Sequence, residues 1–586
     1  MGKIFTSIMN SRLCDYLIEK GIITPEQCGF RKKHGTQDSI FILKALIDKY
    51  VKSKPKKSNN LLFTCFVDFS KAFDSIPRGK LFQKLKLAGV TGRFLEILHS
   101  MYSNDKSSVK IENMLTPAFR CHTGVKQGCM LSPTLFNLYL SDLSEKLKAK
   151  NLNDVEVNEL PLSCMLYADD LVIFSKSKNG LQDYLVSLSE YCKENDLSVN
   201  LNKTKVLIFN NCGRTMNKHV LYYRDSKLDN VSTYKYLGLQ FSTYGTFTYA
   251  KQEIKKVALK ALYKLRKEMG DHFRDDVQLT MKIFDTVISP ILTYGSEVWG
   301  VDHDGKLEND PIEFVQTKFI RWLLGVNKFC SSNACRSEVG RFPMRTKAKC
   351  RAIKYWLKFC EPEHQNKLSG IAFTDQIGQD KKELWSSKLK RLLNLAGLGN
   401  IWSAKTNTPA IMNYIRQRLL DIEQQTWISE IHNDERKDPH QKNKLRTFRK
   451  FKLTHDYENY LTNVRNINHR VAITKLRLSN HKLAIETGRY VKPYQPPDQR
   501  ICPLCKTGLE DEEHFLMNCI AYRDPRRELF NTLKKETNLI LDSMTPSSAF
   551  TTLISMKQGE KTQKIVAKYV YDRFRERDRR VKYNLV

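Results

Sequence analysis

Short apolar runs set off by polar or glycine-rich segments mark the first half of the chain. Residues 61–67 (Leu-Leu-Phe-Thr-Cys-Phe-Val) are apolar, aromatic and β-branched, which predicts a buried strand ending at Asp68. Two further runs, 163–167 and 171–175, have strand length and flank Asp169 and Asp170. This pattern predicts a β-hairpin with two acidic residues at its turn.

Helical spacing prevails outside these strands. Ile4, Ile8, Leu13 and Leu17 are expected on the buried face of a first helix. Further helices are predicted over about 38–49, 78–102 and 132–149, and from about 250 to 440 the pattern is mainly helical, with strand character only near 288–299. Residues 53–60 predict a loop, 434–452 a hinge or an exposed helix, and the proline-rich segment 492–498 an irregular lead-in.

The length of 586 residues predicts about two to four domains. We expect boundaries near 1–250, 251–433, 434–490 and 491–586. The net charge of +34 points to a polyanionic partner, although each basic run taken alone is equally consistent with a solvated surface. No apolar stretch reaches the ~18 residues of a membrane span and no signal peptide is visible, so we expect a soluble, non-secreted protein without membrane partners.

Three carboxylates stand at the ends of the predicted strands. Asp68 follows the first strand, and Asp169 with Asp170 forms the hairpin turn, so all three can meet at one edge of a sheet. Such convergence is unfavourable unless a cation neutralises it, and hard oxygen ligands suit Mg²⁺ held between protein and substrate phosphates. Two metals about 4 Å apart would activate a 3′-hydroxyl and stabilise leaving pyrophosphate, which predicts a phosphoryl-transfer site.

At these residues the chain resembles the reverse transcriptases, and more narrowly those of non-LTR (LINE-type) retrotransposons. The resemblance rests on a series of blocks along the chain: Gln27 to Arg31 with His34 to Thr36, Asp68 to Asp74, Gln127 to Pro133, Tyr167 to Asp170, Leu197 to Phe209, Tyr234 to Gly238 and Tyr294 to Trp299. It implies an α+β right-hand polymerase fold with fingers and palm in 1–250 and a helical thumb and connection in 251–433. A mainly helical C-terminal region with a small zinc-binding module would follow.

The resemblance also implies roles for individual residues. Asp68 and Asp169 would be the principal ligands of two Mg²⁺ ions, supported by Asp170 and the carbonyl of Phe69. Gln127 and Gly128 would line the nascent base pair, because glycine allows close backbone approach. Lys203, or alternatively Lys205, would protonate the leaving pyrophosphate; for either lysine, a solvated edge is the competing interpretation.

Phe73 is the expected steric gate, since an aromatic ring under the incoming sugar leaves no room for a 2′-hydroxyl. Packing in the core is the alternative for this residue. The substrates implied are an RNA template, a DNA primer or target, and deoxynucleoside triphosphates. A chromosomal target implies action in the nucleus after cytoplasmic synthesis.

A separate cysteine and histidine cluster lies near the C-terminus. Cys502, Cys505, His514 and Cys519 supply four ligands within eighteen residues, the number and type that one tetrahedral structural Zn²⁺ requires. Buried thiols with a chance histidine are the alternative. The region resembles the zinc knuckle of LINE-type proteins, which implies contact with nucleic acid, while a purely structural role stays open.

The pattern departs from the family at the front. The block that usually precedes the Gln27–Arg31 segment and contacts the triphosphate is not visible, nor is an endonuclease, so we expect either a truncated reading frame or an incomplete gene model. Arg31, with Lys32 and Lys33, would then substitute in part for the missing cations. The main hypothesis is an RNA-directed DNA polymerase; an intron-maturase-like enzyme or a non-catalytic RNA- or DNA-binding protein derived from a truncated retroelement are the alternatives.

Overall fold

The computed structural model describes residues 2–53, 60–103, 105–149, 155–270, 274–302, 305–379, 381–432 and 444–583. Most of the predicted loop 53–60 and the first part of the basic segment 434–452 lie outside this set. The chain forms two compact units. Unit 1 comprises Met1–Ala250, Gly295–Asp302 and Arg351–Pro409, and unit 2 comprises Lys251–Tyr294, His303–Cys350 and Ala410–Val586. The predicted segment 251–433 therefore contributes to both units.

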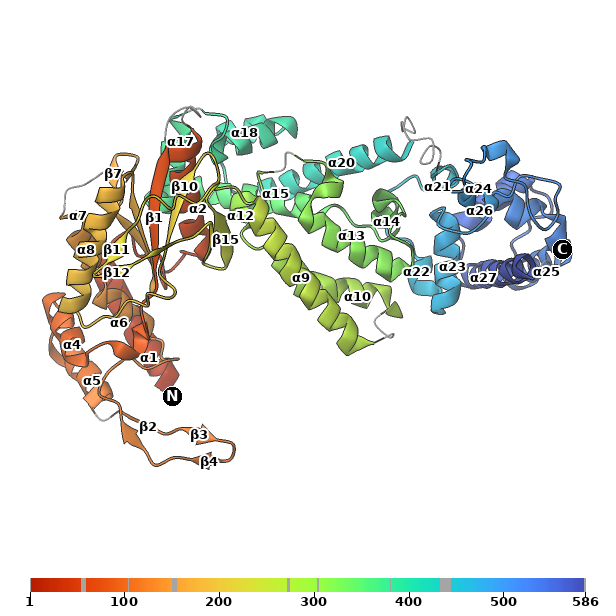
Figure 1. Cartoon of the computed structure of the whole chain (residues 1–586). Coiled ribbons are helices and arrows are strands. Elements are labelled where there is room, and N and C mark those ends of the chain that lie inside the picture. Colours follow the sequence, from red (N-terminus) through yellow and green to blue (C-terminus); the bar gives the residue numbers. More distant parts are fainter. Residues whose placement is uncertain are drawn as a thin grey trace. The chain divides into compact units, whose positions relative to one another are not determined.

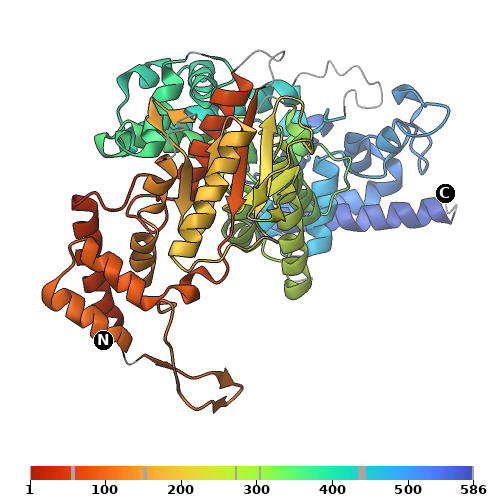
Figure 2. The ribbon, with the colours of Figure 1, turned by 60° about the vertical axis from the view of Figure 1, so that its left-hand side comes forward.

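A five-stranded sheet in the order β13-β10-β1-β9-β8 organises unit 1 (Figure 1). Strand β1 (Leu61–Val67) is central and is almost wholly buried, as its continuous apolar run predicts. It pairs antiparallel with both β9 (Asp170–Ser175) and β10 (Lys205–Asn210). Strand β8 (Cys164–Tyr167) pairs with β9 as the predicted hairpin, which is confirmed. Helix α8 (Lys178–Glu194) packs on β1 and β9 (Figure 2).

The remaining strands of unit 1 are short. They are β2 (Lys106–Ser107), β3 (Lys110–Ile111), β4 (Met114–Leu115), β5 (Phe119–Arg120), β6 (Glu156–Val157), β7 (Leu160–Pro161), β11 (Tyr222–Tyr223), β12 (Ser226–Lys227), β13 (Asp229–Asn230), β14 (Thr233–Tyr236) and β15 (Leu239–Ser242). Its helices are α1 (Gly2–Glu19), α2 (Thr36–Ile47), α3 (Ala72–Ser75), α4 (Arg78–Leu87), α5 (Gly92–Ser103), α6 (Ser132–Tyr139), α7 (Leu143–Lys148), α12 (Ser296–Trp299), α16 (Pro362–Gln365), α17 (Leu368–Ile377), α18 (Trp385–Leu395) and α19 (Gly399–Ala404).

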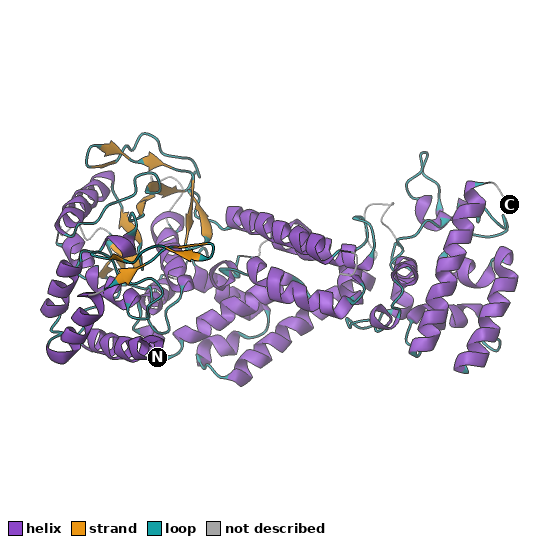
Figure 3. Ribbon diagram, turned by 90° about the horizontal axis from the view of Figure 1, so that it is seen from below, coloured by secondary structure: helices purple, strands orange, loops and turns teal. Residues whose placement is uncertain are grey.

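Among the described residues, helices and connecting loops make up unit 2, whereas every named strand belongs to unit 1 (Figure 3). Its helices are α9 (Thr248–Met269), α10 (Val277–Ile283), α11 (Ser289–Leu292), α13 (Pro311–Leu324), α14 (Ser332–Glu338), α20 (Pro409–His432), α21 (Phe448–Phe451), α22 (Tyr460–Asn463), α23 (Ile467–Arg477), α24 (Ala484–Thr487), α25 (Arg523–Thr537), α26 (Pro546–Ser555) and α27 (Glu560–Lys582). Helix α15 (Met344–Phe359) runs through both units. These assignments support a mixed α+β chain with a helical C-terminal region. In the described residues, no helix has the length and apolarity needed to span a membrane.

The predicted face of the first helix is wrong at its N-terminal end. Leu13 and Leu17 are buried, but Ile4 and Ile8 are exposed, and the buried set is completed by Thr6 and Met9. Spacings of three and four residues keep side chains on one face of a helix, whereas the five-residue step from Ile8 to Leu13 rotates off it.

The predicted strand character near 288–299 is also wrong, because this segment forms α11 and α12. Pro290 follows a π-helical turn (Phe284–Ile288) that joins α10 to α11 without a break, and Gly295 (φ +69°) separates α11 from α12. The predicted helix over 78–102 is divided in a similar way, since Gly89, after α4, and Gly92, the first residue of α5, both have positive φ. The helix expected over 132–149 is divided as well, into α6 and α7.

An aromatic cluster joins the start of unit 1 to its last segments. Phe41 on α2 is fully buried, and its ring lies 5.7 Å from that of Tyr355, 5.3 Å from Phe359 and 5.0 Å from Trp385. The Tyr355 hydroxyl donates to Asp38 at 2.7 Å. Residues 351–409 are therefore an integral part of the core that holds α2.

Candidate active site

Because β1 pairs antiparallel with β9, Asp68 and Asp169 lie at the same edge of the sheet and line one cavity. Val67, the last residue of β1, pairs with Leu171, and Tyr167 pairs with Asp170 across the hairpin turn that holds Asp169. Asp68 and Asp169 thus line the same cavity of about 520 Å³, together with Phe69, Ser70, Lys71, Ala72, Phe73, Asp74, Gln127, Asn200 and Lys203. Asp170 lies next to this cavity, at the start of β9, and does not line it.

The segment before β10 holds the backbone of Asp68 on both sides. Thr204 Oγ1 accepts from the Asp68 N–H at 3.2 Å, and the N–H of Asn200 donates to the Asp68 carbonyl at 2.8 Å. From the same segment, Lys203 Nζ lies 3.5 Å from Asp68 Oδ2. Lys205 instead forms an ion pair with Asp229 at 2.7 Å, outside the cavity lining. Of the two lysines considered for proton transfer, the geometry favours Lys203.

Gln27 holds the turn of the hairpin from the opposite side. Its buried side-chain Oε1 accepts from the N–H groups of Ala168 (3.1 Å) and Gly29 (3.0 Å). Two backbone hydrogen bonds join the same segments: the Cys28 N–H donates to the Leu166 carbonyl (2.8 Å), and the Leu166 N–H donates to the Glu26 carbonyl (2.9 Å). A Cβ at Gly29 would stand 2.2 Å from the Ala168 nitrogen, so only glycine allows this approach.

Ala168 itself has a positive φ of +59°, unusual for a residue with a Cβ. Such backbone strain persists only where surrounding contacts hold it, as Gln27 does here. The sequence analysis gave Gln27 no role. Its partner Ala168 lies 141 residues away, and one glutamine in a glycine-containing segment carries no local signal of that pairing.

Phe73 lines the cavity and also packs against the core, so its role as a gate stays a prediction. Its ring lines the cavity, stacks on Phe136 at 4.4 Å, and meets the exposed Phe30 edge-on at 6.4 Å. Gln127 also lines the cavity, and its Nε2 donates to Asp74 Oδ1 at 2.9 Å. Gly128 has a φ of +80° and open space where a side chain would stand, but it does not line the cavity.

Arg31 is directed to the backbone of its own segment. Its Nη1 donates to the carbonyls of Thr24 and Gln27, both at 3.1 Å, and the residue does not line the cavity. Its predicted contact with a triphosphate therefore stays a prediction. Lys71, which the sequence analysis did not single out, also lines the cavity. It directly precedes α3 and has a left-handed backbone conformation (φ +48°).

The carboxylates repel one another. Partial burial, followed by the negative charge of Asp68, raises the pKa of Asp169 above its usual range. Partial burial and the charges of Asp169 and Asp68 raise the pKa of Asp170 to about 6. A bound divalent cation would relieve this repulsion, and carboxylate oxygens facing one cavity are the donors that Mg²⁺ prefers. The donor set therefore fits the predicted magnesium site.

The C-terminal cysteine and histidine cluster assembles as its spacing predicts. One ligand atom from each of Cys502, Cys505, His514 and Cys519 lies within 4.8 Å of all the others. Cys505 Sγ is 3.3 Å from His514 Nε2, and the sulfurs of Cys502 and Cys519 are 3.9 Å apart. Three sulfurs and one nitrogen this close together fit a closed tetrahedral zinc site.

Several known proteins that this chain resembles in sequence are described as RNA-directed DNA polymerases. Residues 1–241 match the family described as reverse transcriptase (RNA-dependent DNA polymerase). The RNA-directed DNA polymerase from mobile element jockey of Drosophila funebris is 25% identical over 341 residues, covering 56% of this chain and 34% of that protein. The probable RNA-directed DNA polymerase from transposon BS of Drosophila melanogaster is 25% identical over 334 residues, covering 55% and 35%. The matched part thus spans about a third of the length of these curated relatives.

Among solved structures, telomerase from Candida albicans in complex with a fragment of telomeric RNA matches with a TM-score of 0.31 and 13% identity. The match covers 63% of this chain and 57% of that one. A structural similarity of this size carries no further argument.

Proposed function

Through residues 1–241 this chain belongs to the reverse transcriptase family, and from that premise we propose that it is an RNA-directed DNA polymerase. In the proposed reaction it extends a DNA 3′ end on an RNA template, consuming deoxynucleoside triphosphates and releasing pyrophosphate. The main support for the proposal is that Asp68, at the end of the central strand β1, and Asp169, in the turn of the β8–β9 hairpin, line the same cavity. The curated relatives named above are polymerases of mobile elements, which supports the same reaction.

In this proposal, Asp68 and Asp169 hold two Mg²⁺ ions, with Asp170 supporting them. When bound, the metals would lower the pKa of the attacking 3′-hydroxyl and stabilise the charge on the leaving pyrophosphate. Lys203, close to Asp68, is positioned to donate a proton to that leaving group. Phe73 would exclude a ribose 2′-hydroxyl, and Gln127 would contact the template or the incoming nucleotide.

We assign the fingers and palm to residues 1–250 and a helical thumb and connection to 251–433. The basic region 434–490 and the region 491–586 would add contacts to RNA and to target DNA. In the last region, Cys502, Cys505, His514 and Cys519 would bind one structural Zn²⁺. A chromosomal DNA target would place the reaction in the nucleus. The net charge of +34 is consistent with these polyanionic partners.

Primer extension on an RNA template tests the proposal. Asp68→Asn should abolish DNA synthesis while leaving RNA affinity nearly unchanged, because binding depends on Lys and Arg contacts to phosphate. Asp229→Asn is the matched control, since Asp229 lies in the same sheet, pairs with Lys205 and stands outside the cavity. Synthesis retained in Asp68→Asn would refute the site. A wild-type chain that binds RNA tightly but never extends a primer would favour the non-catalytic binding protein.

A further inference from the structure

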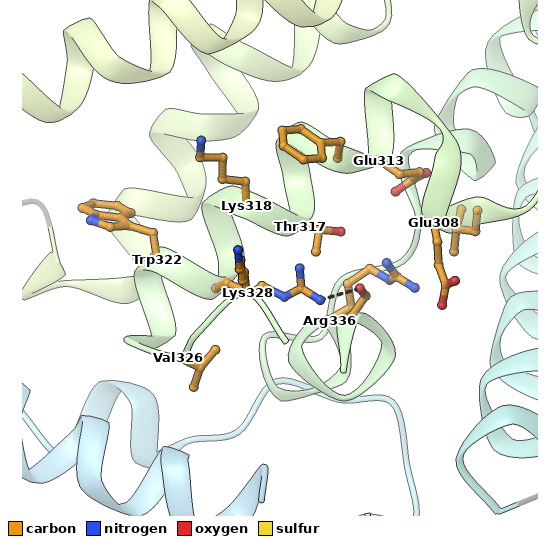
Figure 4. Close-up of a pocket in the computed structure, with 12 residues that line it drawn as sticks. Glu308, Glu313, Thr317, Lys318, Trp322, Val326, Lys328 and Arg336 are labelled. Atoms are coloured by element: carbon orange, nitrogen blue, oxygen red, sulfur yellow. Dashed lines mark hydrogen bonds between the residues drawn. The ribbon is translucent and has the colours of Figure 1, made fainter. Parts of the chain in front are cut away.

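A second cavity of about 520 Å³ lies within unit 2, along helix α13. Its lining includes Glu313, Phe314, Lys318 and Trp322 from α13, Lys328 from the following loop and Arg336 from α14 (Figure 4). We call this cavity the α13 pocket. Its volume is within the range of pockets that hold small ligands. The chemistry proposed above makes no use of it.

The pocket ends on a buried carboxylate that lacks one hydrogen bond. Glu313 is 2% exposed, and one of its oxygens, Oε1, accepts from the Arg345 N–H at 2.7 Å. The other oxygen, Oε2, is buried without a hydrogen-bond partner. Burial outweighs the nearby charge of Arg336 and raises the pKa of Glu313 to about 7. A buried acceptor left unpaired costs about 1–3 kcal/mol. Glu313 lines the pocket, so a ligand N–H group that reaches Oε2 after a local side-chain movement gains affinity there.

Aromatic and cationic groups occupy the rest of the pocket. Phe314, which is 42% exposed, and Trp322 line the pocket together with Lys318, Lys328 and Arg336. Outside the lining, Lys255 Nζ lies 3.9 Å from the ring centre of Phe314, and the Arg266 guanidinium lies 4.4 Å from that of Trp322. Figure 4 places Glu313 and Glu308 at one side of the pocket and Trp322 at the other, with Lys318 and Lys328 between them. Rings beside basic groups are the features that bind unpaired nucleotides through stacking and phosphate contacts.

The combination of a buried carboxylate with aromatic rings and basic groups limits which kind of ligand can bind in the pocket. A free phosphate would meet the carboxylate of Glu313, and a cationic peptide would meet the surrounding lysines and arginines. A nucleotide joins an anionic phosphate to a base with N–H donors, so it satisfies both ends. Paired bases already use these donors, and therefore the base must be unpaired.

We propose that the α13 pocket binds a short single-stranded RNA segment, with one base donating its exocyclic amino group to Glu313. This inference rests on the proposed function, because it takes RNA to be the partner of the chain. Trp322 follows Glu313 by nine positions in α13, a rise of about 13.5 Å along a helix, so more than one nucleotide lies in the pocket. Uracil carries a carbonyl oxygen where cytosine carries its exocyclic amino group, so a uracil held in the same orientation would face Glu313 with an acceptor and is disfavoured at this position.

Fluorescence anisotropy with the full chain tests the inference, using labelled oligocytidylate and oligouridylate RNAs of about 12 nucleotides at constant salt. Phe314→Ala should weaken oligocytidylate binding about 5- to 100-fold through lost stacking. Phe329→Ala is the matched control, because this phenylalanine is 64% exposed on the adjacent loop and does not line the pocket. Neither variant should change the affinity for an RNA duplex. Equal oligocytidylate affinity in the two variants would overturn the proposal.

Glu313→Gln tests the amino-group contact separately. The amide oxygen can still accept from Arg345, but its NH₂ group no longer favours an amino-bearing base. The wild-type chain should bind oligocytidylate about tenfold more tightly than oligouridylate, and this preference should disappear in Glu313→Gln. A wild-type chain without that preference would overturn the assignment. Wild-type primer extension, measured in parallel, reports on the polymerase proposal alone, because the binding assay requires no catalysis.

Discussion

Replacing Gln27 by methionine should loosen the hairpin turn that carries Asp169. Methionine has a similar length and flexibility but no hydrogen-bonding oxygen, so the amides of Gly29 and Ala168 would lose their acceptor. Each buried amide left unpaired costs about 1–3 kcal/mol, which makes about 2–6 kcal/mol for the pair. Even about 2 kcal/mol of local destabilisation accelerates opening of the turn by about thirtyfold, since every 1.4 kcal/mol is a factor of ten.

Amide hydrogen exchange measured by mass spectrometry reads this opening directly in peptides covering 26–29 and 164–170. Gln182→Met is the matched control, because the Gln182 side chain also makes two backbone bonds, both to Tyr222 at 2.9 Å, but at a water-accessible surface. We expect fast exchange only in Gln27→Met, together with a fall of up to about 100-fold in the kcat of primer extension. Exchange in 164–170 that matched the Gln182→Met control would refute the bracing role of Gln27.

Three further outcomes follow from the same geometry. Phe73→Ala should let the enzyme incorporate ribonucleotides, and primer extension with ribonucleoside triphosphates alone measures this; unchanged sugar selection would assign Phe73 to the core. Cys502→Ser should lower the zinc content of purified protein from about one ion per chain and leave Mg²⁺-dependent extension of short primers intact, as metal analysis would show. Without divalent metal, the raised pKa of Asp170 means that the folded chain binds an extra proton, so stability should fall as pH rises from about 4 to 6. Thermal unfolding of Asp170→Asn should lack this component, and an identical pH dependence in the two proteins would contradict it.

The sequence predicted strands β1, β8 and β9 of the central sheet and the cysteine and histidine cluster, although it misassigned the buried face of the first helix and the helical segment 288–299. The apolar run before Asp68 and the two runs around Asp169 have unambiguous strand patterns, and carboxylates at the ends of antiparallel neighbours must lie close together. The grouping of the four zinc-type ligands could be predicted equally well, because the four residues are near one another in the sequence. Their functional roles still depend on the experiments above.

Ion pairs between residues that are far apart in the sequence could not be predicted in this way. The basic run 573–582 and the acidic run 510–513 each suggest a solvated surface. In the structure, however, Arg577 forms a buried ion pair with Glu510, at 2.6 Å, and Glu512 pairs with Arg446 in the same manner. Each such pair uses one positive and one negative charge, so the net charge of +34 is unchanged. The basic run 573–582, counted by itself, nevertheless overstates the number of basic side chains available to RNA, because Arg577 is already paired.

The aromatic cluster around Phe41 governs the order in which the chain can mature on the ribosome. Helix α2 emerges early, but Tyr355, which bonds Asp38, is made 317 residues later. Until Trp385 has also left the exit tunnel, a nascent chain carries every aspartate of the cavity beside an uncovered apolar helix. A polypeptide ending near residue 241 would remain in that unfinished state, so a fragment with a complete unit 1 has to extend through 409.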